Sequence, residues 1–410
     1  MRLLILTQYF PPETGAPQNR LADLALRLKA KGVDVDVFAA MPNYPKMEVF
    51  KGYKGKLYMK DDWQGLRIFR SWIYVSKGRG VVSRLLNYFS FTFSSLFFGT
   101  FVLGKYDYIL VESPPLFTGI SAYILSKFKG AKLVFNVSDL WPESAEKLGI
   151  ITNKTLLNTA TKLEEFLYRK SVLIPVQTQG IRDNIKARFP NKNVYWLPNG
   201  VDTGFWKPEN YTQQWRTDNG FAGTDFLALY AGIIGHAQGL EVIIKAAQLL
   251  ANQPQIKFLL VGDGPEKEKL MAQAKQLDLT SVFFYPSVEK ALMPAIVKAC
   301  NAAVIPLKNL ELFKGAIPSK IFENLAFEKP LLLGVDGEAR KLFIDEGKAG
   351  TYFEPENAEQ LATQVKYMFD NPDKVQQMGK SGREYALQNF NRQTIADAFY
   401  NQLLTIEQSR

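Results

Sequence analysis

The first 31 residues, MRLLILTQYFPPETGAPQNRLADLALRLKAK, contain the pattern that decides the fold. An apolar run, Leu3–Leu6, has the length of a buried strand. The loop after it contains Gly15 and leads into a helix-length amphipathic segment, Arg20–Lys31. A strand, a glycine-containing loop and a helix in this order make one parallel α/β unit.

The same alternation continues to the end of the chain and predicts two Rossmann-like sheets. Strands of the first sheet are expected at Leu3–Leu6, Val33–Ala39, Arg67–Tyr74, Tyr108–Val111, Lys132–Val137, Val172–Gln177 and Val194–Leu197. Strands of the second are expected at Phe226–Ala231, Lys257–Val261, Val282–Tyr285, Ala302–Ile305, Pro330–Val335 and Gly350–Phe353. Helical pattern fills Ala358–Glu407.

A turn-rich stretch, Pro198–Asp202, separates the two strand series. We therefore expect a first domain over residues 1–205, a second over 206–388, and a C-terminal helix over 389–410 that packs back on the first domain. Two open α/β sheets that face each other would hold a ligand in a cleft at the carboxyl ends of their strands.

The composition excludes several classes of protein. Of 410 residues, 47% are hydrophobic and 22% charged, so the chain is neither disordered nor collagen-like. The single cysteine, Cys300, cannot form an intramolecular disulfide, and the single histidine, His236, cannot build a Cys/His metal cluster. The chain opens without a secretory signal pattern, which favours the cytoplasm.

The net charge of +10 is unevenly distributed. Residues 1–205 carry 28 Lys and Arg against 16 Asp and Glu, a net charge of +12, whereas residues 206–410 carry 22 against 24, a net charge of −2. An anionic partner of the first half, either a phospholipid surface or a nucleic acid, would explain this asymmetry. A solubilising basic face is the alternative.

The excess of positive charge is concentrated before a long apolar segment. Between Lys46 and Arg84 lie ten basic and three acidic residues, interleaved with tyrosine, tryptophan and phenylalanine. The next twenty residues, Leu85–Gly104, carry no charge and include Phe89, Phe93 and Phe97. Cations together with aromatic rings are typical of a membrane interface.

The apolar segment is long enough to span a bilayer, which takes about 20 apolar residues. A transmembrane helix is nevertheless disfavoured, because the segment contains serine, threonine and asparagine and leads directly into the strand Tyr108–Val111. One face of such a helix would pack on the sheet and the other would contact a membrane surface or a lipid tail. A fully buried helix is the alternative, and a nucleic acid would need fewer phenylalanines.

Three glycine-containing loops follow expected strands and could bind an anion. They are Tyr9–Pro17, Tyr230–Leu240 and Val261–Pro265. Such loops deliver backbone N–H groups and a helix N-terminus to a phosphate, although many serve turn geometry only. None matches the P-loop, which disfavours simple ATP hydrolysis, and Gly235–Gly239 is not a dinucleotide fingerprint.

The most specific pattern is Gly315–Ala326, in which Pro318 suits the opening of a helix that runs to about Phe327. Ser319 and Lys320 would lie in its first turn and bind a phosphate. Glu323 would share their face and accept hydrogen bonds from a ribose diol. The alternative is a core helix with an exposed Lys320–Glu323 pair.

Together these motifs resemble the retaining, GT-B-fold glycosyltransferases of family 4 over nearly the whole chain. Val261–Pro265, Pro198–Asp202 and the Ser319–Ala326 helix resemble the donor side of that family. Four further stretches resemble its WbuB-like branch of O-antigen, capsule and exopolysaccharide transferases: Tyr9–Gly15, Met41–Pro45, Asp139–Ser144 and Gly232–Leu240. The resemblance implies a nucleotide-sugar donor in the C-terminal domain and a polyprenyl-diphosphate-linked sugar on the N-terminal domain.

The sequence departs from the family pattern at several positions. Of the family's paired glutamates, Glu323 fits the second, and the first falls on Gly315. The cations of the phosphate clamp fall on Ile233 and Gln238, and the histidine before Asp139 is replaced by Ser138. Because His236 lies in the other domain, it is not expected to replace that histidine.

These matches define the expected site. Breaking a glycosyl phosphate bond requires cations or N–H donors on the departing diphosphate, and Lys320 is the candidate cation. The expected donor-binding residues are Gly15, Asn199, Gly235, Gln238, Gly262, Gly264, Ser319, Lys320 and Glu323. The expected membrane and acceptor residues are Arg79, Arg84, Phe89, Phe93 and Phe97. No metal or other cofactor is expected.

Asp139 or Glu143 is expected to orient the acceptor or the sugar, and the leaving phosphate to help take the acceptor proton. A single carboxylate does not establish a covalent route to retention. UDP is the expected nucleotide, and the branch resemblance suggests an N-acetylated 6-deoxy sugar such as L-FucNAc. The enzyme would be peripheral on the inner face of the cell membrane.

Two other functional classes are open. A nucleotide-sugar 2-epimerase or a glycoside phosphorylase could share the fold, but the basic and apolar N-terminal section argues against the first, and no pyridoxal-phosphate lysine motif supports the second. A nucleic-acid-binding protein would explain the charge of +12 but not the Ser319–Glu323 helix.

Overall fold

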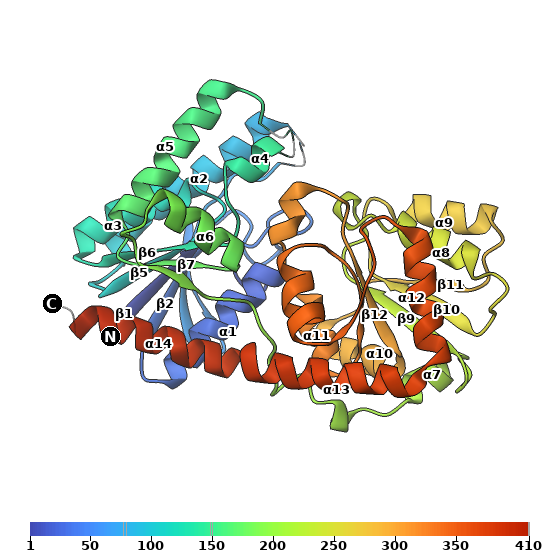
Figure 1. The fold of residues 1–410 in the computed structure, drawn as a ribbon. Coiled ribbons are helices and arrows are strands. Elements are labelled where there is room, and N and C mark those ends of the chain that lie inside the picture. Colours follow the sequence, from blue (N-terminus) through green and yellow to red (C-terminus); the bar gives the residue numbers. More distant parts are fainter. Residues whose placement is uncertain (77, 79, 148, 150, 409–410) are drawn as a thin grey trace. The chain divides into compact units, whose positions relative to one another are not determined.

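A computed structural model describes residues 1–76, 78, 80–147, 149 and 151–408. They form two compact units. Unit 1 consists of Met1–Asn199 and the chain from Gln393 onward, and unit 2 of Gly200–Arg392. Each unit is a mainly parallel sheet with helices on both faces, which confirms the prediction of two Rossmann-like domains (Figure 1).

In the described part of unit 1, eight strands are ordered β3-β4-β2-β1-β5-β6-β7-β8. All neighbours are parallel except β3 and β4. The strands are β1 (Arg2–Thr7), β2 (Asp34–Ala40), β3 (Tyr58–Trp63), β4 (Leu66–Ser71), β5 (Tyr108–Ser113), β6 (Lys132–Val137), β7 (Ile174–Val176) and β8 (Val194–Trp196).

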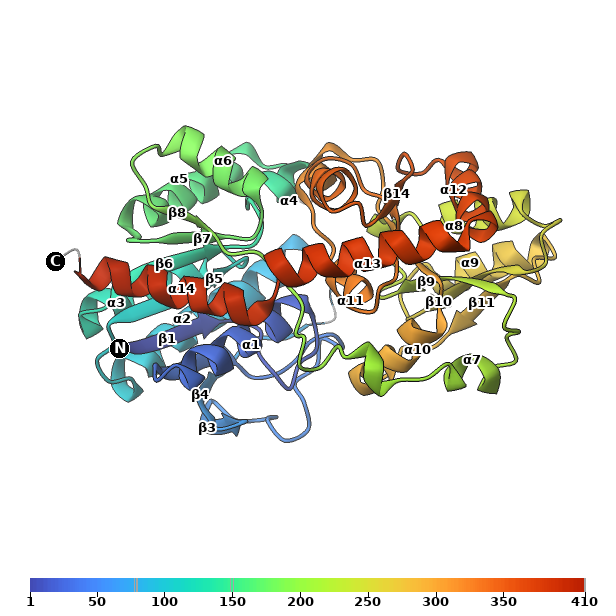
Figure 2. The ribbon, with the colours of Figure 1, turned by 60° about the horizontal axis from the view of Figure 1, so that its bottom comes forward.

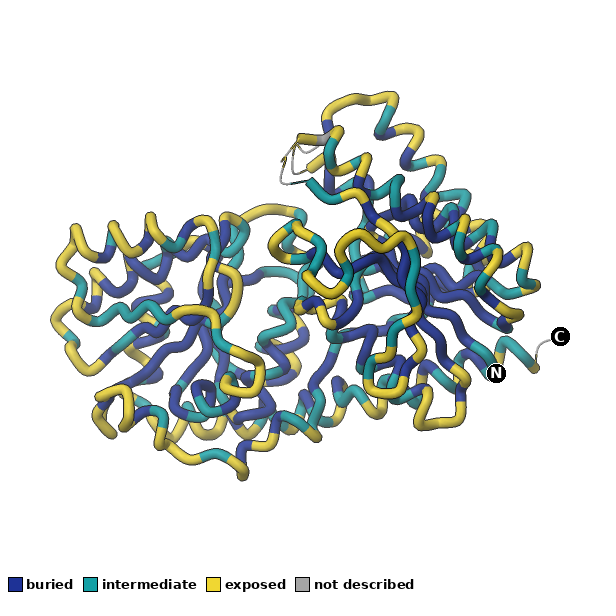
Figure 3. Tube along the Cα trace, turned by 180° about the vertical axis from the view of Figure 1, so that it is seen from behind, coloured by how far each residue is buried: buried dark blue, intermediate teal, exposed yellow. Residues whose placement is uncertain are grey.

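Alternating side chains of β1 build the two halves of the unit 1 core. Leu3 and Ile5 pack in the cluster that includes α1 and α14, whereas Leu4 and Leu6 pack in the opposite cluster with α2, α3 and α5. The helices are α1 (Ala16–Ala30), α2 (Val81–Val102), α3 (Thr118–Lys129), α4 (Glu143–Lys147), α5 (Lys154–Lys170), α6 (Gln179–Arg188) and α14 (Arg392–Gln408). The central strands of both units are almost wholly buried, the edge strands are partly exposed, and the outer faces of the helices are exposed (Figure 3).

The C-terminal helix α14 packs on unit 1. Ala396, Phe399 and Leu403 are buried in the same cluster as Leu3 and Ile5. The hydroxyl of Tyr108 on β5 donates to the carbonyl oxygen of Leu403 over 3.0 Å. Figure 2 shows α14 running beside β1 and α1.

In the part of unit 2 that the structure describes, the strand order is β11-β10-β9-β12-β13-β14, all parallel. The strands are β9 (Phe226–Ala231), β10 (Ile256–Val261), β11 (Val282–Tyr285), β12 (Ala302–Pro306), β13 (Leu331–Gly334) and β14 (Gly350–Tyr352). The helices are α7 (Gln214–Asp218), α8 (Glu241–Leu249), α9 (Lys267–Gln276), α10 (Met293–Ala299), α11 (Lys320–Ala326), α12 (Ala358–Asp370) and α13 (Pro372–Asn389). Shorter helical turns are η1 (Pro208–Asn210), η2 (His236–Gln238), η3 (Lys290–Leu292), η4 (Glu311–Gly315) and η5 (Arg340–Glu346).

The chain passes between the units at Asn199/Gly200 and at Arg392/Gln393, whereas the sequence suggested 205/206 and 388/389. The segment after Gly200 packs within unit 2. Val201 bridges to Asn391, and the rings of Trp206 and Phe327 lie 5.6 Å apart.

The strand orders place a topological switch point in each unit, where ligands of α/β sheets bind. In unit 1 it lies between β1 and β5, and the loop containing Gly15, which follows β1, lies next to it. In unit 2 it lies between β9 and β12, beside the Gly232–Leu240 loop and the segment that leads to Lys320.

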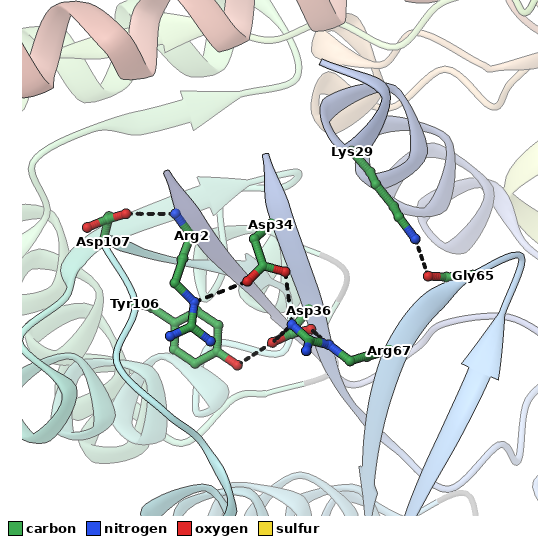
Figure 4. A network of polar contacts seen from close by, with 8 residues as sticks. All are labelled: Arg2, Lys29, Asp34, Asp36, Gly65, Arg67, Tyr106 and Asp107. Carbon is green, nitrogen blue, oxygen red and sulfur yellow. Dashed lines mark hydrogen bonds and ion pairs between the residues drawn. The ribbon is translucent and has the colours of Figure 1, made fainter. Parts of the chain in front are cut away.

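A polar network occupies the opposite, amino-end edge of the unit 1 sheet (Figure 4). Arg67 donates to Asp36 over 2.7 Å and to Asp34 over 2.9 Å, and Tyr106 donates to Asp36 over 2.6 Å. Arg70 is fully buried and pairs with Asp61 at 2.7 Å. Arg67 and Arg70, both counted in the basic segment between Lys46 and Arg84, therefore pair with carboxylates of the same sheet.

Candidate active site

Glycines allow the loops after β9 and β10 of unit 2 to approach each other closely. Gly232 and Gly262 have φ of +143° and +150°, a region that favours glycine. A Cβ on Gly262 would lie 1.9 Å from the carbonyl oxygen of Gly232, and one on Gly264 would lie 2.2 Å from that of Ile234. The loops after β9 and β10 therefore touch through their backbones, and side chains at these positions would separate them.

The Lys320 side chain lies beside Gly232. Its ammonium stands 3.9 Å above the ring centroid of Tyr230, and a Cβ on Gly232 would be 2.9 Å from the Lys320 Nζ. Lys320 forms no ion pair with any residue that the structure describes. Burial lowers the pKa of Lys320 to about 7, against a smaller opposite effect of Glu323. A partly buried cation without a counter-ion is a natural partner for an anionic ligand.

Glu323, three residues further along α11, is the nearby carboxyl group. Burial raises its pKa, while the positive charges of Arg392, Lys290 and Lys320 act in the opposite direction. Its surroundings are thus rich in positive charge. Ser319 is the residue before α11 rather than part of its first turn, and its side chain makes no capping hydrogen bond.

The remaining predicted residues of the β9 loop lie close together in sequence and structure. Gly235 is buried, and a Cβ there would lie 3.0 Å from the Gln238 Oε1. Gln238 is partly buried at the end of η2. His236 is exposed, and its Nδ1 lies 3.0 Å from Oε1 of Glu266, the residue before α9.

Asp263 is held by its own neighbours. It accepts hydrogen bonds from Lys267 Nζ and the Ser287 backbone N–H, over 2.8 and 2.9 Å, which lower its pKa to about 2. Lys267 also donates to the carbonyl oxygens of Gly262 and Tyr285. The Lys267 side chain therefore holds the loop after β10 next to the loop after β11.

Two buried side chains that the sequence analysis missed hold the first loops of unit 1. The Glu13 carboxylate accepts from the backbone N–H groups of Phe10, Asn43 and Tyr44, over 3.1, 2.8 and 2.8 Å. It ties the Gly15 loop to the loop after β2. Arg70 donates to the carbonyl oxygens of Ala40 and Pro11, so it also joins these two loops.

A second buried network supports Asp139. Arg20 on α1 donates to Glu112 over 2.7 Å and to the Ser138 hydroxyl over 3.0 Å, and Ser138 donates to Glu112. Asn136 also donates to Glu112. Ser138, which stands where the resembling family has a histidine, therefore serves as an anchor for the loop after β6. Arg20 and Glu112 carry no local sequence signal, because they lie 92 residues apart.

Asp139 and Glu143 differ in their surroundings. Asp139 is partly buried and accepts from the Ser144 hydroxyl and the Leu140 N–H, yet burial raises its pKa above the usual value. Glu143 is also partly buried and pairs with Lys147 at 2.7 Å, one turn along α4. Of the two, Asp139 has the environment expected of a reactive carboxyl group.

Gly15 and Asn199, predicted to bind the donor, belong to unit 1. Gly15 caps α1 in an extended conformation, and a Cβ on it would lie 2.4 Å from Gln18 Oε1. Asn199 is the last residue before the chain enters unit 2. The other residues that the sequence predicts to bind the donor all belong to unit 2.

Helix α2 presents one apolar face to solvent. Phe93, Phe97 and Phe101 are 68%, 60% and 74% exposed, at helical spacing, and Arg84 is exposed near the start of the helix. Phe89 was expected on this face, but it is partly buried against Phe117, with ring centroids 4.4 Å apart. Arg79 lies outside the described residues.

Helix α2 is the single described helix that is long and apolar enough to cross a membrane, by length and composition. Its other face is buried: Phe91 and Ser95 are fully covered, and Ser95 donates to Ser121 on α3 over 3.0 Å. No group of three or more His, Cys, Asp or Glu side chains among the described residues could hold a metal ion.

Comparison with known proteins agrees with these features. Residues 15–200 match the model of the "Glycosyl transferase 4-like domain", and residues 212–385 match that of "Glycosyl transferases group 1". The colanic acid biosynthesis glycosyl transferase WcaI of Escherichia coli K12 is 25% identical over 98% of this chain and 100% of its own length. The O-antigen chain mannosyltransferase C of Escherichia coli is 21% identical over 45% of this chain and 48% of its own length.

Solved structures share the fold. HepE of Anabaena, in complex with UDP and glucose, superposes with a TM-score of 0.72 at 18% identity, covering 99% of this chain and 100% of HepE. Sucrose-phosphate synthase of Thermosynechococcus elongatus superposes with a TM-score of 0.73 at 16% identity, with the same coverage. With two Rossmann-like units, matching models on both and transferases as relatives, this chain is a glycosyltransferase of the GT-B fold.

Proposed function

We propose that the enzyme moves a sugar, with retention of configuration, from a nucleotide-diphosphate donor to a lipid-linked saccharide in cell-surface polysaccharide synthesis. The binding of a nucleotide-diphosphate donor is supported by the position of Lys320. This cation has no described ion-pair partner and lies beside the Gly232 and Gly262 loops. A departing diphosphate needs such a cation. UDP is the proposed nucleotide, and HepE, of the same fold, was solved with UDP.

Residues of unit 1 are proposed to act on the acceptor. Asp139, held by the Arg20–Glu112–Ser138 network, would orient the acceptor hydroxyl or the sugar, and a phosphate oxygen of the leaving group would help take the proton. The resemblance to the WbuB-like branch supports both retention and the lipid-linked acceptor. The relatives reported above are named as transferases, which favours transfer over epimerisation.

Incubation with radiolabelled UDP- and GDP-sugars and a bacterial lipid extract tests this proposal. We expect label from one donor to move into the organic phase and to be released from the lipid by mild acid. Label recovered only in nucleotide sugar of altered configuration would instead identify an epimerase, and label in free sugar alone would contradict transfer to a lipid.

The enzyme is further proposed to bind the inner face of the cell membrane through α2. Binding to anionic vesicles should persist at high salt, because apolar contact is not screened as charges are. A Phe93→Ser/Phe97→Ser variant should bind at least about tenfold more weakly. Leu249→Ser, at an exposed leucine of α8, is the matched control. Vesicle binding that vanishes at high salt and is unchanged in the phenylalanine variant would contradict this assignment.

A further inference from the structure

A groove of about 510 Å³ opens in unit 1 beside the loops after β2 and β4. Its apolar and aromatic lining includes Met41, Val49, Tyr53, Leu57, Trp72 and Ile73. Because β2 and β4 are parallel to β1, the groove lies at the same carboxyl-end edge of the sheet as the Gly15 loop. No function assigned so far uses it.

The groove has a fixed inner wall. Tyr53 donates to Asp61 over 2.9 Å, and Arg70 binds the same carboxylate at 2.7 Å with its guanidinium 5.2 Å from the Tyr53 ring. Arg70 also donates to Pro11 in the Gly15 loop. One buried side chain thus supports both the groove and the Gly15 loop.

The outer side of the groove is pinned to α2. The Ser94 hydroxyl donates to the Trp72 carbonyl oxygen, and the Tyr74 N–H donates to the Ser90 hydroxyl over 2.8 Å. The Trp72 N–H donates to the Leu57 carbonyl oxygen over 2.9 Å, which joins two segments of the lining. The apolar lining is therefore built on the helix that carries the exposed phenylalanines.

Two lysines in the lining favour a negatively charged ligand in the groove. Lys54 and Lys56 belong to its lining, which contains one carboxylate, Glu48. The Lys54 Nζ lies 4.0 Å from Glu48 in an exposed pair, and Lys56 forms no ion pair with a described residue. Leu57 and Trp72 are 63% and 42% exposed beside them. Ammonium groups next to an uncovered apolar trough match a phosphate joined to a hydrocarbon chain.

We propose that this groove binds the lipid of the acceptor, with the first isoprenoid units along Leu57 and Trp72 and the attached diphosphate at Lys54 and Lys56. The inference rests on the proposed function, since it assigns a place to the acceptor's lipid. It predicts that the enzyme recognises the isoprenoid diphosphate itself, independently of the saccharide and of the bilayer.

Farnesyl diphosphate, a soluble isoprenoid diphosphate without sugar, is the probe, and calorimetry measures its affinity. A Leu57→Ser/Trp72→Ser variant should bind it about tenfold more weakly and leave binding of inorganic diphosphate unchanged. A Lys54→Ala/Lys56→Ala variant should weaken both ligands. Phe128→Ser, at a 69% exposed phenylalanine outside the groove, should change neither.

Three results would overturn the inference. Farnesyl diphosphate could bind equally to wild type and to the Leu57→Ser/Trp72→Ser variant. Its binding could depend on Lys320 alone, which would place it in the nucleotide site. The groove variant could lose vesicle binding but keep farnesyl diphosphate, which would identify a site for bulk lipid. Failure of the proposed function is distinct, because it would appear as absent transfer to extracted lipids.

Discussion

A Lys320→Ala variant is expected to lose roughly 100- to 1000-fold in kcat/KM for the nucleotide-sugar donor, the range seen when one preorganised group that stabilises transition-state charge is removed. The ammonium lies over the Tyr230 ring, next to Gly232, and forms no ion pair with a described carboxylate. Its loss would leave the departing diphosphate with backbone donors and more distant charges. Steady-state kinetics with varied donor concentration measures the effect.

The control for this variant is Lys366→Ala, which removes an exposed lysine paired with Asp370 at 2.7 Å on α12. It should retain wild-type kinetics. A circular dichroism melt of both variants would show that unit 2 is folded. Turnover of Lys320→Ala within a few-fold of wild type would contradict the assignment of Lys320 to the leaving group.

An Asp139→Asn variant is expected to lower kcat by about 100-fold or more, with little change in KM for the donor. Asparagine keeps an oxygen that can accept from the Ser144 hydroxyl, so the loop should stay in place while the negative charge is lost. Rapid-quench or steady-state measurements of product formation would report kcat.

Two variants separate the charge of Asp139 from its surroundings. Glu143→Gln removes a carboxylate that pairs with Lys147, and should cost no more than a few-fold in kcat. Ser144→Ala removes a hydrogen bond but keeps the charge, and should be intermediate. Full activity of Asp139→Asn, or an equal loss in Glu143→Gln, would reject the role proposed for the Asp139 carboxylate.

The sequence predicts the fold well because its signals are local. Apolar runs mark the central strands, and the glycines at 232, 262 and 264 stand where loops must approach closely, which their φ values and neighbours explain. β3 was missed because Tyr58–Trp63 is a polar edge strand, partly exposed along its length. Its antiparallel pairing with β4 depends on a partner rather than on its own periodicity.

The sequence predicted the candidate site best where its charged side chains lie on one helix, α11. Lys320 and Glu323 lie three residues apart, so spacing places them together. The Arg20–Glu112 pair and the three N–H donors on Glu13 join segments that are distant in sequence. Charge counting also overstated the basic surface, since Arg67 and Arg70 have partners that only the folded sheet supplies.

The central claim is that the Lys320 ammonium holds the donor's diphosphate, and the pH dependence of donor affinity tests it most directly. In the free enzyme the pKa of Lys320 is about 7, and a bound diphosphate would raise it. Binding therefore takes up a proton above pH 7, and affinity is full below that pH and falls as the pH rises.

The measurement is calorimetry of UDP- and GDP-sugars, whose diphosphates do not titrate near neutrality, at pH 6 and pH 8. We predict that at least one binds and that its affinity is about tenfold lower at pH 8. His236→Gln should keep this dependence, and Lys320→Arg should abolish it. Absence of binding by every nucleotide sugar, or equal affinity at both pH values in wild type, would contradict the account.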